Sequence, residues 1–535
     1  MLINNQYESK VLDHLGLVSG MVEELNMVET IDNVIVQDMK DRNVSVGQCV
    51  LAMILNGLGY ANKRLYLVSK FFESKPIERL IGEGVESSHL NDSVLGRALD
   101  DIYDFGVDKL FSIISQQAIN ILDIKPKYAH IDTSSFSVEG QKYSNDENSI
   151  KITYGYSKDN RADLKQAMLG LIVDNIAGVP LALKPLSGNS SDKVEIKDMV
   201  NAHISALKNL SISSIVADSA MYSEKNIKEL DKKGVKWITR VPNNIVGELI
   251  ENIDKSSMRE LVDGYKGVEV SSIYGVKQRW LILYSPKSKE QAEKTVQKKF
   301  LKESTTEIKS FHKLFKERFY CIEDAQKAIE NFTKKLKYIT IDTNILHHHH
   351  YKGKGRPKAN SKPIKTTYSI EGSAFIHISD YEETLEKKGY FVLATNELNN
   401  SEISTKDILL TYKNQSKVEK GFRFMKDNEF LASAFYVKSP QRIETLMFIM
   451  TLCLLVYSAL EYKIRQELLK QNKSFIDQKN KSTQIPTMRW IFQYFNGIHL
   501  LKIQKIQEQD MVLNLDKYHI LIINLLGISY EKYYI

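Results

Sequence analysis

The sequence predicts a mixed α/β protein, and three observations along the chain support this prediction. Residues 1–125 carry apolar side chains at helical spacing, as in VGQCVLAMILNGLGY. From Tyr128 onward the pattern changes to β-rich runs, first YAHIDTSSFSV and then AMLGLIVDNIAGVPLALKPL, with a turn at Ala177-Gly178. Helical segments then alternate with the runs SISSIVADSAMY and VKWITRV, an order that indicates an α/β core with a mixed sheet.

The rest of the chain divides by the same patterns. Residues 243–388 combine strand-like pieces with a Lys-rich helical stretch, and we expect them to interrupt the core as an insertion. The core then resumes with the strand GYFVLATN and two helices, at residues 404–428 and 443–470. The predicted segments are therefore 1–125 (helical), 126–242 (first part of the core), 243–388 (insertion), 389–470 (second part of the core) and 471–535 (role unassigned).

Positive charge is concentrated in one part of the chain. The formal net charge is +7, and residues 284–365 hold 20 Lys and Arg against 9 Asp and Glu, a surplus of 11 that leaves the remainder at −4. A local surplus indicates a polyanionic partner, because Lys and Arg contacts to phosphates displace condensed counterions. A solvated Lys-rich helical face is the alternative interpretation.

The cysteines and the apolar segments indicate the cellular setting. Cys49, Cys321 and Cys453 are odd in number and far apart, which disfavours a disulfide framework and a Cys-based zinc site and indicates a reducing setting. The start, MLINNQYESKVLDHLGLVSG, lacks a basic segment followed by an apolar one, which argues against secretion. The apolar stretch LMFIMTLCLLVYSAL has 15 residues, fewer than the about 20 that span a bilayer, and predicts a buried core helix. We expect a cytoplasmic, nucleoid-associated protein.

Two aspartates lie in apolar strand-like runs, where burying a charged side chain is energetically unfavourable. Asp132 lies in the middle of an apolar strand-like run, and Asp218 lies at the end of another. A carboxylate in a run suited to burial loses solvation unless a cation or a hydrogen-bond donor compensates. A capping or turn role is the alternative for each residue, and more so for Asp218.

A third carboxylate, Glu419, falls on a predicted helix that has a narrow polar stripe. At about 100° per residue, an arc of about 80° on this helix holds Tyr412, Gln415, Glu419, Arg423 and Lys426. Apolar side chains occupy the other side, as expected of a helix that borders a core. The arc favours a carboxylate set among phosphate-contacting groups, whereas a plain amphipathic surface helix is the alternative.

The residue types indicate the chemistry. Three carboxylates without a His or Cys cluster suit Mg²⁺ or Mn²⁺, which take oxygen ligands and keep several waters. Two such ions about 4 Å apart can activate a water or a 3′-hydroxyl on one side of a phosphodiester and stabilise the leaving oxygen on the other. The residues therefore point to chemistry on a DNA strand.

These motifs resemble those of DDE transposases, in the insertion-sequence group related to IS4 and closest to its IS1634 branch. HIDTSSFSV resembles the first Asp motif, and ADSAMYS resembles the second. YGYSKDNRADLKQAMLGLIVD followed by GVPLALKPLSGNSSD is similar to the second-strand region of this family. The signature Y-(2)-R-(3)-E-(6)-K falls on Tyr412, Gln415, Glu419 and Lys426. The sequence departs from the signature at one position, where Gln415 replaces Arg. A Gln can hydrogen-bond a phosphate but carries no positive charge.

The resemblance implies an RNase H-like catalytic core interrupted by a β-rich basic insertion, with helical N-terminal and C-terminal regions. Asp132 and Asp218 would bind Mg²⁺ or Mn²⁺ directly, and Glu419 would complete the shell of the second ion. DNA-phosphate contacts are expected from Tyr412, Gln415, Arg423, Lys426, Lys165, Gln166, Lys298, Lys299, Lys334, Lys335 and Arg356. Residues 1–125 would recognise the ends of the element. The partners would be double-stranded DNA, as element ends and as target, and a second copy of the chain.

The implied activity is metal-dependent DNA cleavage and strand transfer in cut-and-paste transposition, and two alternatives stay open beside it. One is an RNase H-like nuclease that only hydrolyses DNA. The other is a catalytically silent DNA-binding protein derived from a transposase, which the presence of all three carboxylates disfavours. A membrane protein is a remote third alternative that rests only on residues 446–460.

Overall fold

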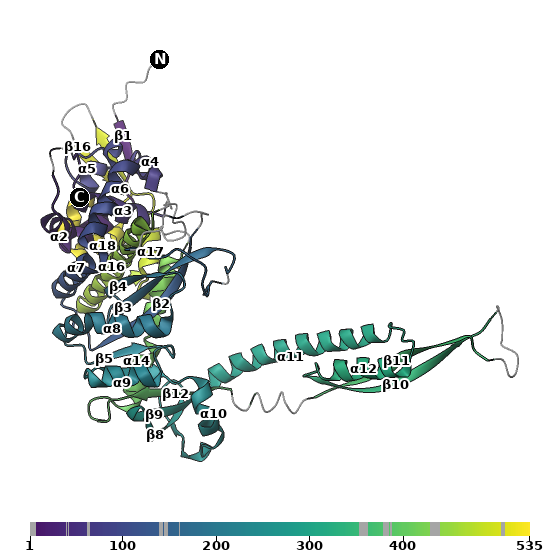
Figure 1. Cartoon of the computed structure of the whole chain (residues 1–535). Coiled ribbons are helices and arrows are strands. Elements are labelled where there is room, and N and C mark those ends of the chain that lie inside the picture. The colour runs from purple at the N-terminus through teal and green to yellow at the C-terminus, as the bar shows by residue number, and fades with distance from the viewer. Residues whose placement is uncertain are drawn as a thin grey trace. The chain divides into compact units, whose positions relative to one another are not determined.

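The computed structural model describes residues 7–38, 40, 42–60, 65–138, 143, 148–159, 161–352, 362–377, 385, 388–427, 439–503 and 509–535 (Figure 1). The chain divides into two compact units. The first comprises Met1–Arg240, Ser272–Arg279 and Ala394–Ile535, and the second comprises Val241–Ser271 and Trp280–Leu393.

The amino-terminal part of the first unit is helical, as predicted, except for one strand, β1 (Tyr7–Val11). Its helices are α1 (Leu15–Glu24), α2 (Met27–Val34), α3 (Val46–Leu58), α4 (Val68–Phe72), α5 (Ile77–Leu80), α6 (Asp92–Phe105) and α7 (Val107–Ile121). Local sequence signals fix where two of them begin. Ser45 and Gln48 form a capping box at α3, and the Asn91 side chain accepts the Val94 N–H at the start of α6.

The core of this unit is built around α16 (Pro440–Lys470). This helix contacts α1, α3, α6 and α7, which brings the amino-terminal helices together on one element. Within the described residues it is the one helix long and apolar enough to cross a membrane, and 83% of its most apolar window is buried in the protein. Residues 446–460 therefore form the buried core helix that the sequence predicts.

The carboxy-terminal residues, which the sequence left unassigned, also belong to the first unit. They form β13 (Phe475–Ile476), β14 (Ser482–Thr483), α17 (Met488–Tyr494), β15 (His499–Ile503), β16 (Gln509–Leu513), α18 (Lys517–Leu526) and α19 (Ile528–Tyr534). Strands β1, β15 and β16 make an antiparallel sheet. α19 packs on α1 at Gly16 and Gly20, where an added Cβ would lie 2.7 Å and 2.5 Å from Tyr side chains of the last residues.

The large sheet of the first unit is mixed, as predicted. Its strands are β2 (Tyr128–Val138), β3 (Lys165–Asp174), β4 (Pro180–Ser187), β5 (Ser214–Ala217) and β6 (Lys236–Arg240), in the order β4-β3-β2-β5-β6. The first three are joined as antiparallel neighbours, whereas β2, β5 and β6 are parallel. The connections to β5 and β6 contain α8 (Asp192–Asn209) and α9 (Glu224–Lys232), because parallel neighbours need a crossover.

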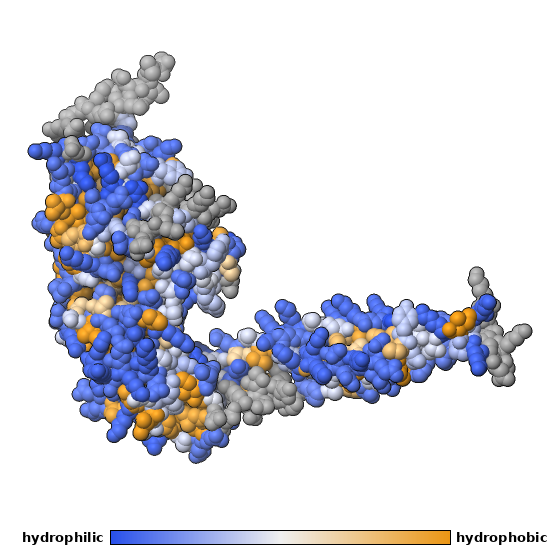
Figure 2. All heavy atoms as spheres, in the orientation of Figure 1, coloured by the Kyte–Doolittle hydropathy of each residue, from blue (hydrophilic) through white to orange (hydrophobic). Residues whose placement is uncertain are grey.

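The insertion combines strands with helices. Its elements are α10 (Asn243–Glu251), β7 (Arg259–Glu260), β8 (Lys266–Tyr274), β9 (Val276–Tyr284), α11 (Pro286–Leu314), α12 (Ile322–Thr333), β10 (Ile339–His350) and β11 (Lys365–Ile376). The next strand, β12 (Tyr390–Thr395), is the predicted strand GYFVLATN. α11 has 29 residues, and its surface is mostly hydrophilic (Figure 2). Strong helix formers and i,i+4 pairs such as Glu290–Lys294 at 2.7 Å favour this helix. Phe311, Leu314, Ala325 and Ile370 form a small core between α11, α12 and the β10–β11 hairpin.

The predicted helix at residues 404–428 is two helices, α14 (Thr405–Lys413) and α15 (Ser416–Met425). At the junction the Gln415 N–H bonds the Tyr412 carbonyl at 2.9 Å, and the Lys417 N–H bonds the Asn414 carbonyl at 2.9 Å. These are turn bonds rather than bonds of a continuous α-helix. Tyr412 therefore lies on a different helix from Glu419, and the single arc predicted for them does not hold.

Candidate active site

Asp132 lies on β2, and Asp218 directly follows β5, the parallel strand next to it. β2 and β5 pair in a register that sets Ile131 opposite Ala217. Each aspartate is the next residue, and neighbouring strands lie about 4.8 Å apart. The structure thus brings together two residues that are 86 positions apart in the sequence.

Burial raises the pKa of both carboxyl groups. For Asp132 it raises the pKa to about 7, with a further increase from the charge of Asp218, against the opposing effects of Lys158 and the Thr133 N–H. For Asp218 burial again raises the pKa, although its side chain accepts the Ala220 N–H at 2.9 Å. Two neighbouring carboxyl groups that lose solvation in this way favour a bound cation.

Lys158 supplies positive charge beside this acidic pair. Its Nζ donates to the Thr133 carbonyl at 2.6 Å and lies 3.1 Å from Asp192 Oδ2. Asp192 also accepts the Thr133 hydroxyl at 2.6 Å, so α8, β2 and the Lys158 segment are tied together. The main-chain N–H of Lys158 donates to Ser135 Oγ at 3.0 Å. Sequence reasoning missed Lys158 and Asp192, although both lie in the segments YGYSKDNRADLKQ and GNSSD that carry the family resemblance.

Glu419 shares a cleft with Asp132. The cleft has a volume of about 690 Å³, and its lining includes Asp132, Lys158, Glu419, Arg423 and Lys426. Glu419 and Arg423 are exposed on α15. Across the described part of the chain, no three His, Cys, Asp or Glu side chains lie close enough together to hold a metal ion. Asp132 therefore adjoins Asp218 and shares the cleft with Glu419, but the three carboxylates do not form one closed group.

Tyr412 lies within the electrostatic reach of all three carboxylates. Burial raises the pKa of its hydroxyl to about 12, and the charges of Asp218, Glu419 and Asp132 add to this effect, while Arg240 opposes it. Such effects weaken with distance, so Tyr412 lies near the cleft that Asp132 and Glu419 line. With this pKa the phenol stays protonated at neutral pH and can donate a hydrogen bond.

Lys426 follows α15 and lines the cleft, where it already has partners. Its Nζ donates to both carboxylate oxygens of Asp159 at 2.8 Å and lies 5.4 Å from the centre of the Phe136 ring. Asp159 is adjacent to Lys158, so the segment that supplies Lys158 to the cleft also holds Lys426.

Gln415 is buried, which corrects the predicted phosphate contact. Its side chain is 6% exposed, its Oε1 lies 3.0 Å from His130 Nδ1, and its Nε2 donates to the Ile131 carbonyl at 2.9 Å. Both ends of the amide are therefore used inside the protein. The two partners immediately precede Asp132 on β2, so Gln415 attaches the start of α15 to the strand of the first aspartate.

Gln166 is also buried, with 2% of its surface exposed, and this too corrects a predicted phosphate contact. Its Nε2 donates to the Gly188 carbonyl at 2.7 Å. A Cβ added to Gly155 would lie 2.0 Å from the same carbonyl oxygen, so the two family-like segments pack together here. The neighbouring Lys165 has its Nζ 5.6 Å from the centre of the Tyr143 ring and is not part of the cleft lining.

The other predicted DNA contacts belong to the second unit. Four lysines are exposed at the end of α12 and on α11, where Lys299 lies 3.9 Å from Glu303: Lys298, Lys299, Lys334 and Lys335. Arg356 lies outside the described residues.

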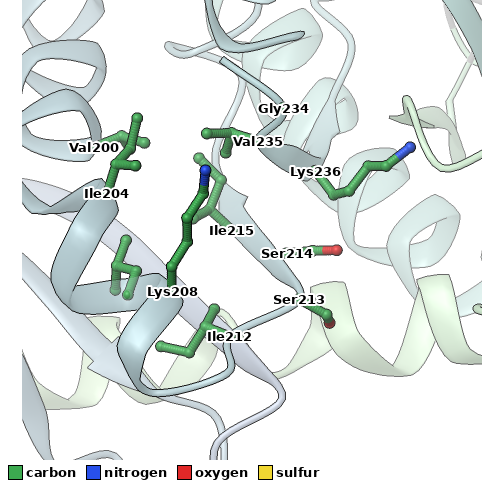
Figure 3. A pocket seen from close by; sticks show the side chains of 11 residues that line it. Val200, Ile204, Lys208, Ile212, Ser213, Ser214, Ile215, Gly234, Val235 and Lys236 are labelled. Atoms are coloured by element: carbon green, nitrogen blue, oxygen red, sulfur yellow. The ribbon is translucent and has the colours of Figure 1, made fainter.

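A small cavity lies at the opposite ends of β5 and β6 from the aspartates. It has a volume of about 40 Å³ and is lined by apolar side chains such as Val200, Ile204 and Ile215, beside the stem of Lys208 (Figure 3). A cavity of this kind can hold at most a few waters. It does not contribute to the acidic site.

Comparison with known protein families identifies the class of this chain. Residues 129–456 match the family described as the transposase DDE domain, a segment that contains all three carboxylates. Residues 7–116 match a domain of unknown function, DUF4277. The first match covers more than half of the chain and defines the class, a DDE transposase. The chain belongs to this family.

The other comparisons add little. No curated protein matches the chain. A cryo-EM structure of a piggyBac transposase synaptic complex with hairpin DNA aligns over 91% of this chain and 80% of that chain, with 10% identity and a TM-score of 0.38. A similarity at this level carries no argument about this chain.

Proposed function

We propose that this chain binds the terminal inverted repeats of an insertion sequence and catalyses metal-dependent DNA cleavage and strand transfer, moving the element by cut-and-paste transposition. The observation that supports this most is the pair Asp132 and Asp218, adjacent on parallel strands and raised in pKa by burial. The strand order β4-β3-β2-β5-β6 supports an RNase H-like core. The sequence motifs favour the IS1634 branch of the IS4-related group.

The acidic residues fit a divalent metal ion. Asp132 and Asp218 would hold Mg²⁺ or Mn²⁺, and Glu419, exposed in the same cleft as Asp132, would supply a further oxygen ligand. The raised pKa values indicate carboxyl groups that a cation would stabilise in the ionised form. When bound, the metal would activate a water or a 3′-hydroxyl and stabilise the leaving oxygen.

The remaining side chains of the cleft would position the DNA strand. Arg423 is exposed beside Glu419 and would contact a phosphate. Lys158, close to the acidic pair, would limit the repulsion between the carboxylates and the approaching phosphate. The protonated Tyr412 hydroxyl would donate to a phosphate oxygen. We further propose that two copies act on paired ends, in the cytoplasm and on the nucleoid.

Strand transfer is the test of this function. The full chain is incubated with Mg²⁺, a supercoiled target plasmid and a pre-cleaved duplex that ends in a 3′-hydroxyl and carries the inverted repeat flanking the gene. The expected product is plasmid covalently joined to the duplex, because an activated 3′-hydroxyl attacks a phosphodiester of the target. Plasmid nicking without joining would instead favour the nuclease, and DNA binding with neither reaction would favour the catalytically silent protein.

The lysines of the second unit are expected to contribute affinity without sequence preference. Changing Lys298, Lys299, Lys334 and Lys335 together to Ala should weaken binding to end DNA and to unrelated duplexes by the same factor. The slope of log Kd against log salt should fall by about 0.9 for each lysine that contacts a phosphate. Fluorescence anisotropy over a salt series measures both effects.

A quadruple change of the same residues to Arg is the matched control, because it keeps the charge and should keep the slope. Weaker binding to end DNA alone would contradict the prediction, since phosphate contacts carry no sequence information.

A further inference from the structure

We infer that the first unit holds a second phosphate-binding cleft, on the other side of α15 from the acidic cleft, which takes the backbone of double-stranded DNA. The nature of this ligand rests on the proposed function. At about 100° per residue, Lys417, Lys420 and Gly421 fall on one side of α15, whereas Glu419 and Lys426 fall on the other. The second cleft has a volume of about 410 Å³.

The second cleft is lined by an excess of positive charge. Five of its lining residues are cations: Lys417, Lys420, Arg423, Arg465 and Arg489. Its two carboxylates, Asp427 and Glu461, leave a net charge of +3. An excess of this size in a concave site attracts an anion.

The two carboxylates are already engaged by two of the arginines. Arg489 lies 2.7 Å from Asp427, and Arg465 lies 2.7 Å from Glu461. Neither Lys420 nor Arg423 forms an ion pair with any residue that the structure describes, and both are exposed. Their charges are therefore available to a ligand.

Lys417 is anchored beside the other cations of this cleft. Its Nζ donates to the carbonyl oxygens of Asn175 and Ile176, on the turn after β3. Its charge therefore adds to those of Lys420 and Arg423, which line the same cleft. Like charges held together in a concave site are stabilised by an anion between them.

The two clefts are continuous through shared residues. Arg423 and Asp427 line both of them. Along one strand of duplex DNA, successive phosphates are about 3.4 Å apart on the helix axis. A duplex that places one phosphate in the acidic cleft can therefore place others near Lys420. This continuity favours DNA over a small free anion as the ligand.

Chemical acetylation of lysines in the full chain tests the inference without any cleavage. The chain is treated with an acetylating reagent in EDTA, alone, with duplex DNA or with inorganic phosphate, and modification is measured by mass spectrometry. Duplex DNA is expected to protect Lys420 several-fold, whereas inorganic phosphate is not. Lys406, exposed on α14 and outside both clefts, is the matched control and should react equally in all samples.

Binding measurements complete the test. Lys420→Ala should weaken duplex binding and lower the salt slope by about 0.9, and Lys406→Ala should change neither. An unprotected Lys420 in a complex that protects other lysines would overturn this inference and leave the proposed function in place. Equal protection by inorganic phosphate would overturn DNA as the ligand. Failure of the chain to bind any duplex would overturn both.

Discussion

Replacing Asp132 with Asn is expected to abolish metal-dependent cleavage of end DNA while leaving DNA binding intact. The change keeps the size of the side chain and removes the charge that would hold the metal, beside Asp218 on the neighbouring strand. We expect a loss of cleavage rate on the order of 10³-fold or more, the effect of removing a principal electrostatic group from an active site. Gel assays of cleavage and anisotropy measurements of binding separate the two outcomes.

The same variant should be more stable than the parent protein above pH 7 when no divalent cation is present. Burial raises the pKa of Asp132 to about 7, from an ordinary value of about 3.9. The folded protein therefore holds an extra proton between these pH values, and its stability falls as the pH rises through this window. The amide that replaces the carboxyl group cannot ionise, so the variant loses this pH dependence, and the difference in Tm should be near zero at pH 4 and largest above pH 7.

Metal binding gives a second readout of the same residue. Mg²⁺ or Mn²⁺ should raise the Tm of the parent protein more at pH 8 than at pH 6, because the ligand must be deprotonated. The Asp132→Asn variant should show little of this shift. Asp123→Asn is the matched control, since Asp123 is exposed and its left-handed backbone, with φ of 48°, suits Asn. Near-normal cleavage by Asp132→Asn would remove this residue from the site.

The sequence predicts the acidic pair because local pattern and chain order agree there. Asp132 interrupts an otherwise apolar strand, and Asp218 ends the next strand that follows a helical crossover, so a parallel register places them together. The core helix at residues 446–460 and the Lys-rich helix of the insertion are also evident, because each has a long and consistent composition.

Features that depend on tertiary packing could not be predicted. The turn before α15 occurs where helical periodicity continues, at the point where the Gln415 side chain bonds to β2. Lys158 lies in a loop, and its partner Asp192 is distant in sequence. The position of the carboxy-terminal residues could not be predicted either. Their Tyr side chains pack over Gly16 and Gly20, and a contact between residues so far apart in the sequence leaves no local pattern.

Replacing Gln415 with Arg, the residue of the family signature, is expected to destabilise this protein. The Gln415 Oε1 can only accept, so His130 Nδ1 carries the proton and donates to it. Burial lowers the pKa of His130 to about 4, which keeps the imidazole neutral. An Arg offers no acceptor to His130 and places a charge at a position that is 6% exposed, close to Lys417.

The cost of an unpaired buried charge is about 3–5 kcal/mol, whereas Gln415→Met, which removes the hydrogen bonds without adding a charge, should cost about 1–3 kcal/mol. Ser416→Arg is the matched control, because it adds the same charge at the next position, which is exposed. Urea unfolding should therefore rank the variants as Ser416→Arg, then Gln415→Met, then Gln415→Arg in decreasing stability. Cleavage should fall in both Gln415 variants, since α15 carries Glu419 and loses its attachment beside Asp132. A stable and more active Gln415→Arg protein would show instead that this side chain reaches the DNA.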